Sequence, residues 1–225
     1  EYAGLIRNYR DLAGELGVDI AGCTRAEREE KLVVAAWKAW GDQMGLHING
    51  QFAIALYDTD TGELFCTRDK LGAELLFYYE TADGRLLVAT QIKGLFDQPG
   101  FKRELNRELI QFYMGFTYVP GEETLFKGVL KLAPGGYLRF GAAGLQLGSY
   151  WKLSFEPDES KTLEQWADEI ADAMDASIRD ICDEGEQPDS FLSGGVDSSY
   201  ILAKSPAKKG YCVAYEDQTK SEEAE

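Results

Sequence analysis

The order of apolar and polar residues divides the chain into two regions. Through Leu153, short segments in which apolar and polar residues alternate are separated by turn residues, a pattern typical of half-buried antiparallel strands. Beyond it, one long segment has the residue spacing of an amphipathic helix, and a glycine-rich turn follows. The pattern therefore predicts an α+β region with antiparallel strands, followed by the start of an α/β region.

One longer helix, three strand pairs and two short helices are predicted in the first region. Thr24 and Glu27 have the spacing of a capping box and an apolar stripe follows up to Gly41, which predicts a helix over 24–40. Asp83-Gly84 is a strong turn signal within the second strand pair. The strand pairs are expected at 51–57 with 63–67, 75–80 with 85–90, and 137–140 with 145–151, and the short helices at 91–97 and 106–115, with Asn106 as a cap.

A polar linker is expected at 154–161, before the second region begins. Thr162 and Gln165 then form another capping box, and a long amphipathic helix is predicted from the apolar positions Leu163, Trp166, Ile170, Met174, Ile178 and Ile181. A strand, a glycine-rich turn, a helix and a second strand at 210–215 follow. Two strands and one helix cannot cover both faces of a parallel sheet, so we expect this domain to be cut short.

Composition and charge exclude several functional classes. The 225 residues carry a net charge of −16, whereas a nucleic-acid surface would need a basic patch. The acidic run between Glu156 and Gln187 is typical of a solvated helix face. The apolar runs at 32–37 and 52–57 are too short to cross a bilayer, and the N-terminus does not resemble a signal peptide. We therefore expect neither nucleic acid nor membrane as a partner.

The cysteines point to a reducing compartment. The chain has four cysteines at positions far apart in the sequence, Cys23, Cys66, Cys182 and Cys212. Such spacing fits neither a zinc site nor a disulfide framework, and it is typical of reduced thiols. The sequence therefore predicts a cytoplasmic protein.

The segment Ser193-Gly194-Gly195-Val196-Asp197-Ser198 carries the clearest candidate chemistry. It lies between an apolar stub and a helix-like segment, so its glycines can turn backbone N–H groups inward, next to the first N–H groups of the helix. Ser193 and Ser198 can add hydroxyl donors, and Asp197 can hold a magnesium ion against phosphate oxygens. A Gly-Lys-Ser/Thr sequence is missing, which excludes the Walker phosphate loop. The segment resembles the pyrophosphate loop of ATP pyrophosphatases.

Motifs in the same order along nearly the whole chain resemble the asparagine synthetase family. The motifs are Asn49–Asp58, Arg68–Gly72, Tyr118–Gly121, Thr124–Phe126, Leu132–Gly135, Tyr150-Trp151 and Leu192–Ser199. The resemblance implies a partial class II glutamine amidotransferase domain over 1–153, an antiparallel sandwich of the N-terminal-nucleophile type. It implies the N-terminal part of an ATP pyrophosphatase domain over 162–225, in a chain truncated at both ends.

The same resemblance implies a function and a nucleotide site. The function is ATP-dependent amide formation, in which an aspartate-like carboxylate is adenylated and then amidated by a nitrogen donor. ATP and Mg²⁺ are the implied cofactors, and residues 1–225 are expected to be inactive alone. Asp197 would hold the metal, Val213 would contact adenine through its backbone, and the residues around the pyrophosphate would be Leu192, Ser193, Gly194, Gly195, Asp197 and Ser198. For Arg68 and Asp69 we prefer a structural role.

Departures from the family pattern predict a degenerate glutaminase. The family's nucleophile is a cysteine at the start of the mature chain, acting with its own amino group. The four cysteines here are internal, so we assign no catalytic residue. Ala3 replaces the oxyanion-hole asparagine, Leu5 replaces a glutamate, and the aspartate that binds the glutamine amine corresponds at best to Glu29.

Two further interpretations remain open. β-Lactam synthetases and lasso-peptide cyclases resemble this family, have impaired glutaminase domains, and use an intramolecular amine in place of ammonia. The second open interpretation is a pseudoenzyme that keeps the fold without the activity. The sequence also leaves the oligomeric state open, with a homodimer among the choices.

Overall fold

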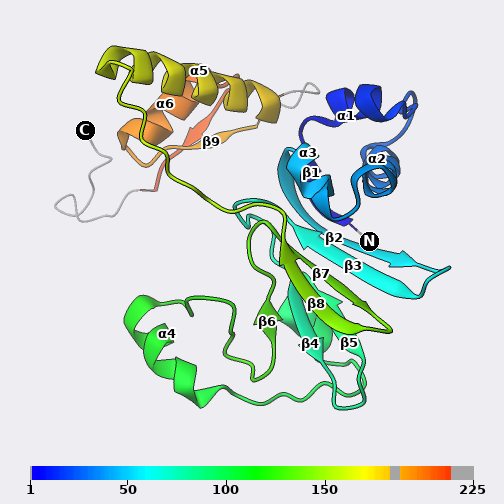
Figure 1. The fold of residues 1–225 in the computed structure, drawn as a ribbon. Helices are drawn as coiled ribbons and strands as arrows, with labels where there is room; N and C mark the ends of the chain where they lie inside the picture. The colour runs from blue at the N-terminus through cyan, green and yellow to red at the C-terminus, as the bar shows by residue number, and fades with distance from the viewer. Residues whose placement is uncertain (1, 183–187, 214–225) are drawn as a thin grey trace. The chain divides into compact units, whose positions relative to one another are not determined.

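A computed structural model describes residues 2–182 and 188–213. The chain forms two compact units, Glu1–Ser154 and Phe155–Glu225, each described by itself below (Figure 1). Within the described residues, none of the helices has the length and apolar character that crossing a bilayer requires. The last two residues of the strand predicted at 210–215 lie outside the described part of the chain.

Two antiparallel sheets form the centre of the first unit. The larger has the order β1-β2-β3-β7-β8, with β1 Tyr2–Ile6, β2 Gly50–Asp58, β3 Glu63–Arg68, β7 Gly136–Gly141 and β8 Gly144–Ser149. The smaller has the order β5-β4-β6, with β4 Phe77–Glu80, β5 Leu86–Ala89 and β6 Leu130–Lys131. Every pairing in these two sheets is antiparallel, which confirms the predicted α+β class for this unit.

Strand β2 separates two layers of the core. Phe52 and Ile54 are buried in a cluster with side chains of helices α1 (Tyr9–Leu16) and α2 (Arg25–Trp40). Ala53 belongs to a second cluster, which includes Leu76 and Tyr78 from the smaller sheet and the segment before it. Because successive strand residues point to opposite faces, β2 packs against helices with large side chains and against the smaller sheet with alanines.

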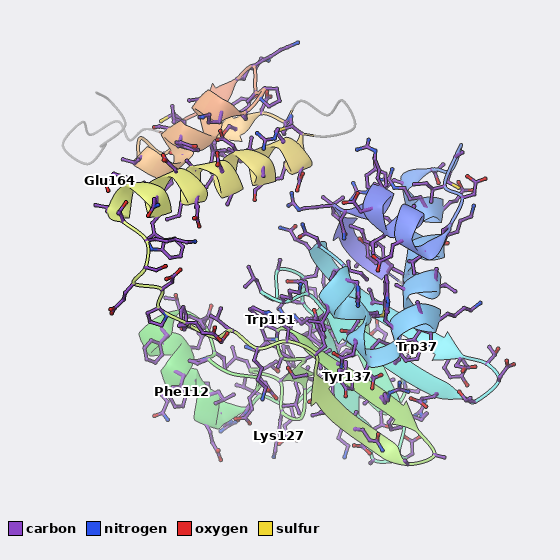
Figure 2. All side chains as sticks on the ribbon, turned by 45° about the horizontal axis from the view of Figure 1, so that its top comes forward. Trp37, Phe112, Lys127, Tyr137, Trp151 and Glu164 are labelled. Atoms are coloured by element: carbon purple, nitrogen blue, oxygen red, sulfur yellow. The ribbon has the colours of Figure 1, made fainter. Side chains whose placement is uncertain are left out.

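Helix α2 forms as the sequence predicts. The Thr24 hydroxyl oxygen accepts a hydrogen bond from the Glu27 N–H, and the Glu27 carboxylate accepts one from the Thr24 N–H. Gly41 follows the last turn. Trp37, labelled in Figure 2, lies on this helix with its ring centroid 4.2 Å from that of Phe65 in β3. Aromatic packing therefore joins the predicted helix to the centre of the larger sheet.

The predicted short helices are shorter than expected. Residues 91–97 contain a 3-10 turn, η2, at Ile92–Leu95, and residues 106–115 contain η3, Arg107–Leu109, followed by α4, Ile110–Phe116. Asn106 occupies the predicted N-cap position, before η3, but its side chain makes no capping hydrogen bond. None of the α4 residues is buried, including Phe112, which Figure 2 labels.

Four elements near the start of the chain were not predicted. They are β1, α1, the 3-10 turn η1 (Gly41–Gln43) and α3 (Met44–His47). Gly4 interrupts the alternation of β1, and α1 is only 8 residues long. Short elements of this kind are held by packing against the sheet, which a local pattern does not show.

The second unit contains a long helix and a small parallel strand pair. Its elements are α5 (Leu163–Ile181), β9 (Ser190–Phe191), α6 (Val196–Lys204) and β10 (Gly210–Tyr211). The Thr162–Gln165 capping box is present, and Asp175 of α5 accepts hydrogen bonds from the Tyr200 hydroxyl at 2.8 Å and the Lys204 ammonium at 2.9 Å. Of the apolar stripe predicted on α5, only Ile178 is buried.

Candidate functional site

The glycine-rich turn lies between β9 and the N-terminus of α6. Ser190 pairs with Gly210 and Phe191 with Tyr211 in a parallel register, so the turn leaves the carboxyl end of β9. Gly194 has φ +80°, a conformation that residues with a side chain rarely adopt. The first helical hydrogen bond runs from the Ser199 N–H to the Gly195 carbonyl, which leaves the preceding N–H groups of α6 without acceptors inside the helix. This geometry suits an anion.

The two predicted hydroxyl donors lie side by side. The Ser193 and Ser198 oxygens are 3.1 Å apart, and the Ser193 N–H donates to the Ser198 oxygen at 3.2 Å. The Ser198 hydroxyl also contacts the Gly195 carbonyl at 3.1 Å. Asp197 is exposed and makes no hydrogen bond or ion pair with another described residue, so its carboxylate is available to a cation.

Leu192 and Val213, which were predicted to contact the nucleotide through their backbones, are not placed as expected. The Leu192 N–H donates to the Tyr211 carbonyl at 2.8 Å, so it belongs to the sheet and cannot also face a phosphate. Strand β10 ends at Tyr211, and Val213, which we expected on that strand, follows it with 71% of its surface exposed. Ser193, Gly194, Gly195, Asp197 and Ser198 thus form the compact part of the predicted nucleotide site.

A cavity of about 450 Å³ lies in the first unit, between β1–β2 and the β5 side of the smaller sheet. Ala3 is among its lining residues and pairs in register with Ala53. None of the described residues that line it is charged, and Tyr2, Thr90 and Gln91 are those with polar side chains. An amino acid such as glutamine carries two charges, for which this lining supplies no partner.

The Glu29 carboxylate is held by hydrogen bonds to β1 and to α2. Its side chain is buried, and one oxygen accepts from the Ile6 N–H at 3.3 Å and from the Arg25 side chain, also at 3.3 Å. The carboxylate therefore ties α2 to the end of β1. This position does not leave Glu29 free to take the place of the family's glutamine-binding aspartate.

Arg68 and Asp69 form a buried turn, as the preferred structural interpretation predicted. Arg68 donates to the carbonyls of Gly72 at 2.6 Å, Glu74 at 2.7 Å and Leu132 at 2.6 Å. The Asp69 carboxylate accepts from one backbone N–H group of β2 and from three of the turn, those of Phe52 and of Leu71, Ala73 and Glu74. The Tyr150 hydroxyl donates to the Arg68 carbonyl at 2.7 Å, so the end of the first unit closes on the same turn.

The cysteines form no site together. All four are free thiols, and the described residues contain no group of three or more histidine, cysteine, aspartate or glutamate side chains that could hold a metal ion. Burial raises the pKa of the Cys66 thiol to about 12, which keeps it protonated in the core.

Residues 1–151 match the sequence profile of a family described as a glutamine amidotransferase domain. The chain belongs to the glutamine amidotransferase family. This result covers the whole sandwich of the first unit and agrees with the motifs at 49–58 and 68–72. The amidotransferase region contains the uncharged cavity and the Arg68 turn, whereas the glycine-rich turn lies outside it.

Curated relatives confirm the resemblance to asparagine synthetases. Asparagine synthetase [glutamine-hydrolyzing] 1 of Bacillus subtilis is 29% identical over 230 residues, covering 98% of this chain and 35% of the relative. A Mycobacterium tuberculosis protein, provisionally named asparagine synthetase [glutamine-hydrolyzing], is 32% identical over 209 residues, covering 90% of this chain and 32% of the relative. The chain thus spans about a third of the length of these relatives.

A solved structure overlaps weakly with the chain. It is the glutamine phosphoribosylpyrophosphate amidotransferase from B. subtilis complexed with ADP and GMP, which is 11% identical, with a TM-score of 0.41. The overlap covers 96% of this chain and 46% of that one. Similarity of this extent supports no conclusion about the site.

Proposed function

We propose that this chain is part of an ATP-dependent amide-forming ligase of the asparagine synthetase type. The observation that carries the proposal is the turn from Ser193 to Ser198, in which paired hydroxyls, free helical N–H groups and an exposed carboxylate meet at the end of a parallel strand. The names of the curated relatives support the same reaction. A nitrogen donor and a small carboxylate are the proposed substrates.

The turn would act on the pyrophosphate part of ATP. The N–H groups at the start of α6 and the hydroxyls of Ser193 and Ser198 would donate to phosphate oxygens, where negative charge grows as the bond to the α-phosphate breaks. The acceptor carboxylate would attack the α-phosphate to give an acyl-adenylate, and an amine would then displace the adenylate to form the amide. Bound Mg²⁺, for which the free Asp197 carboxylate is a fitting ligand, would neutralise phosphate charge.

Replacing Asp197 by alanine tests this assignment. We expect ATP–pyrophosphate exchange in the complete protein that contains this chain to fall by about 100-fold or more, because an electrostatic contact to the developing charge is lost. Asp172→Ala is the matched control, since Asp172 is also exposed but lies on α5, and it should leave exchange unchanged. Exchange at the normal rate in Asp197→Ala would refute the role of this carboxylate.

The nitrogen donor of this ligase is proposed to be ammonia or an internal amine. Ala3 offers no amide donor for an oxyanion, Glu29 is bound to Ile6 and Arg25, and the cavity beside Ala3 has an uncharged lining. These observations favour a degenerate glutaminase. They keep the intramolecular-amine ligases, of the β-lactam synthetase or lasso-cyclase kind, as the second candidate.

A comparison of nitrogen sources checks this part. In the complete protein, glutamine should support amide formation at least about 100-fold less well than ammonium chloride, since a lost oxyanion donor costs about that factor. Turnover with neither nitrogen source, but with a substrate that carries its own amine, would favour the second candidate. Ordinary glutaminase rates would show that the domain is not degenerate.

A further inference from the structure

A single carboxylate on α5 holds two side chains of α6, the helix that follows the glycine-rich turn. One oxygen of Asp175 accepts a hydrogen bond from the Tyr200 hydroxyl at 2.8 Å, and the other accepts one from the Lys204 ammonium at 2.9 Å. The Asp175 side chain is 26% exposed. Helices α5 and α6 lie side by side within the second unit (Figure 1). The glycine-rich turn is thereby linked to α5 through α6.

The contact attaches α6 at two points that lie about one turn apart. Tyr200 and Lys204 are separated by four positions, so both lie on one face of the helix. Asp197 precedes Tyr200 by three positions, which places it about 4.5 Å away along the helix axis and on a neighbouring part of the surface. A rotation of α6 about its axis would therefore move the Asp197 carboxylate, and the two attachments to Asp175 oppose such a rotation.

Apolar packing determines this rotation only weakly. None of the α6 residues, all of which the structure describes, is buried, and the N-cap is Gly195, which has no side chain to form a cap. The hydrogen bonds from Lys204 and Tyr200 lower the pKa of Asp175, so the carboxylate that accepts them is ionised at neutral pH. Hydrogen bonds to a charged acceptor are stronger than those between neutral groups. The Asp175 contact is therefore the main restraint that the described residues place on the orientation of α6.

We propose that Asp175 is a positioning residue for the glycine-rich turn, because it holds α6 in the orientation that directs the Asp197 carboxylate and the first helical N–H groups. This role rests on the proposed function, in which those groups bind magnesium and the pyrophosphate part of ATP. Asp175 would act through α6 and not by contact with the ligand. The Lys204 ammonium balances the charge of Asp175, so the carboxylate does not repel the anion strongly. Misplacing a positioned group by 1 Å can cost about 100-fold.

Titration calorimetry with magnesium pyrophosphate on the complete protein that contains this chain tests the role. This probe does not require the acceptor substrate to be known. We expect Asp175→Ala to weaken binding about tenfold, because α6 loses both attachments and its binding groups are displaced. Asp175→Asn should weaken binding by no more than about threefold, since an amide oxygen still accepts from the Tyr200 hydroxyl.

Asp172→Ala is the matched control, because it removes the same charge from an exposed position of α5. Removal of a negative charge by itself would strengthen the binding of an anion. Weaker binding in Asp175→Ala, with unchanged or stronger binding in Asp172→Ala, is therefore the result that a positioning role predicts. Loss of folded protein would instead lower the number of binding sites and leave their Kd unchanged.

The outcomes separate this role from the proposed function. Equal Kd values for the wild-type protein and Asp175→Ala would overturn the positioning role and leave the nucleotide site in place. The same holds for equal weakening in Asp175→Ala and Asp172→Ala, or in Asp175→Ala and Asp175→Asn. A wild-type protein that does not bind magnesium pyrophosphate would overturn the nucleotide site, and the role of Asp175 with it.

Discussion

Replacing Arg68 by methionine is expected to lower the free energy of unfolding of the amidotransferase domain by about 3 to 5 kcal/mol. Arg68 is 4% exposed, and its guanidinium is the hydrogen-bond donor to the carbonyls of Gly72, Glu74 and Leu132. Methionine keeps much of the stem but leaves these acceptors without that donor. The Asp69 carboxylate would also lose the nearby cation.

Urea unfolding followed by tryptophan fluorescence measures this effect. Arg103→Met is the matched control, because Arg103 is exposed and contacts the exposed Asp97 at 3.0 Å. The control should change the free energy of unfolding by no more than about 0.5 kcal/mol. Equal losses in the two variants would mean that the buried turn does not support the fold as described.

Replacing Gly4 by alanine is expected to cost about 2 to 5 kcal/mol, from backbone strain together with overpacking. Gly4 lies within β1 with φ +125°, and a Cβ atom there would be 1.9 Å from the Gln51 carbonyl oxygen. The oxygen belongs to the backbone of β2, so it cannot move away without disturbing the pairing of the two strands. We therefore expect β1 to separate at least locally from β2.

Gly14→Ala supplies the control for this substitution. Gly14 lies in α1, and a Cβ atom there would meet nothing within 4 Å. Because alanine is the better helix former, this variant should gain about 0.5 to 1 kcal/mol. Hydrogen exchange of the β1 and β2 amides separates the two effects, with faster exchange in Gly4→Ala alone. Unchanged exchange and stability in Gly4→Ala would contradict the close approach.

Local signals in the sequence were sufficient for part of the fold. The capping boxes at Thr24 and Thr162 each involve residues three positions apart, and both are present in the structure. Gly194 supplies the positive φ that the glycine-rich turn requires. In each case the partners lie within a few residues of one another, so their spacing is enough to identify the contact.

Contacts between residues far apart in the sequence could not be predicted from local patterns. The Ile6 N–H that occupies Glu29 lies 23 residues away, and the Leu132 carbonyl that Arg68 contacts lies 64 residues away. The Leu192 N–H looked available to a phosphate, but pairing with β10 occupies it. The partner in each case is set by how strands and helices pack, which a local pattern does not contain.

The closure of the Arg68 turn has a consequence for how the protein is made. The turn draws on Leu132 and on Tyr150, whose hydroxyl contacts a carbonyl 82 residues earlier in the chain. During synthesis, β2 and β3 leave the ribosome long before these partners exist. The amidotransferase region therefore completes its core only after Tyr150 has emerged, because Tyr150 is part of the buried cluster around β2.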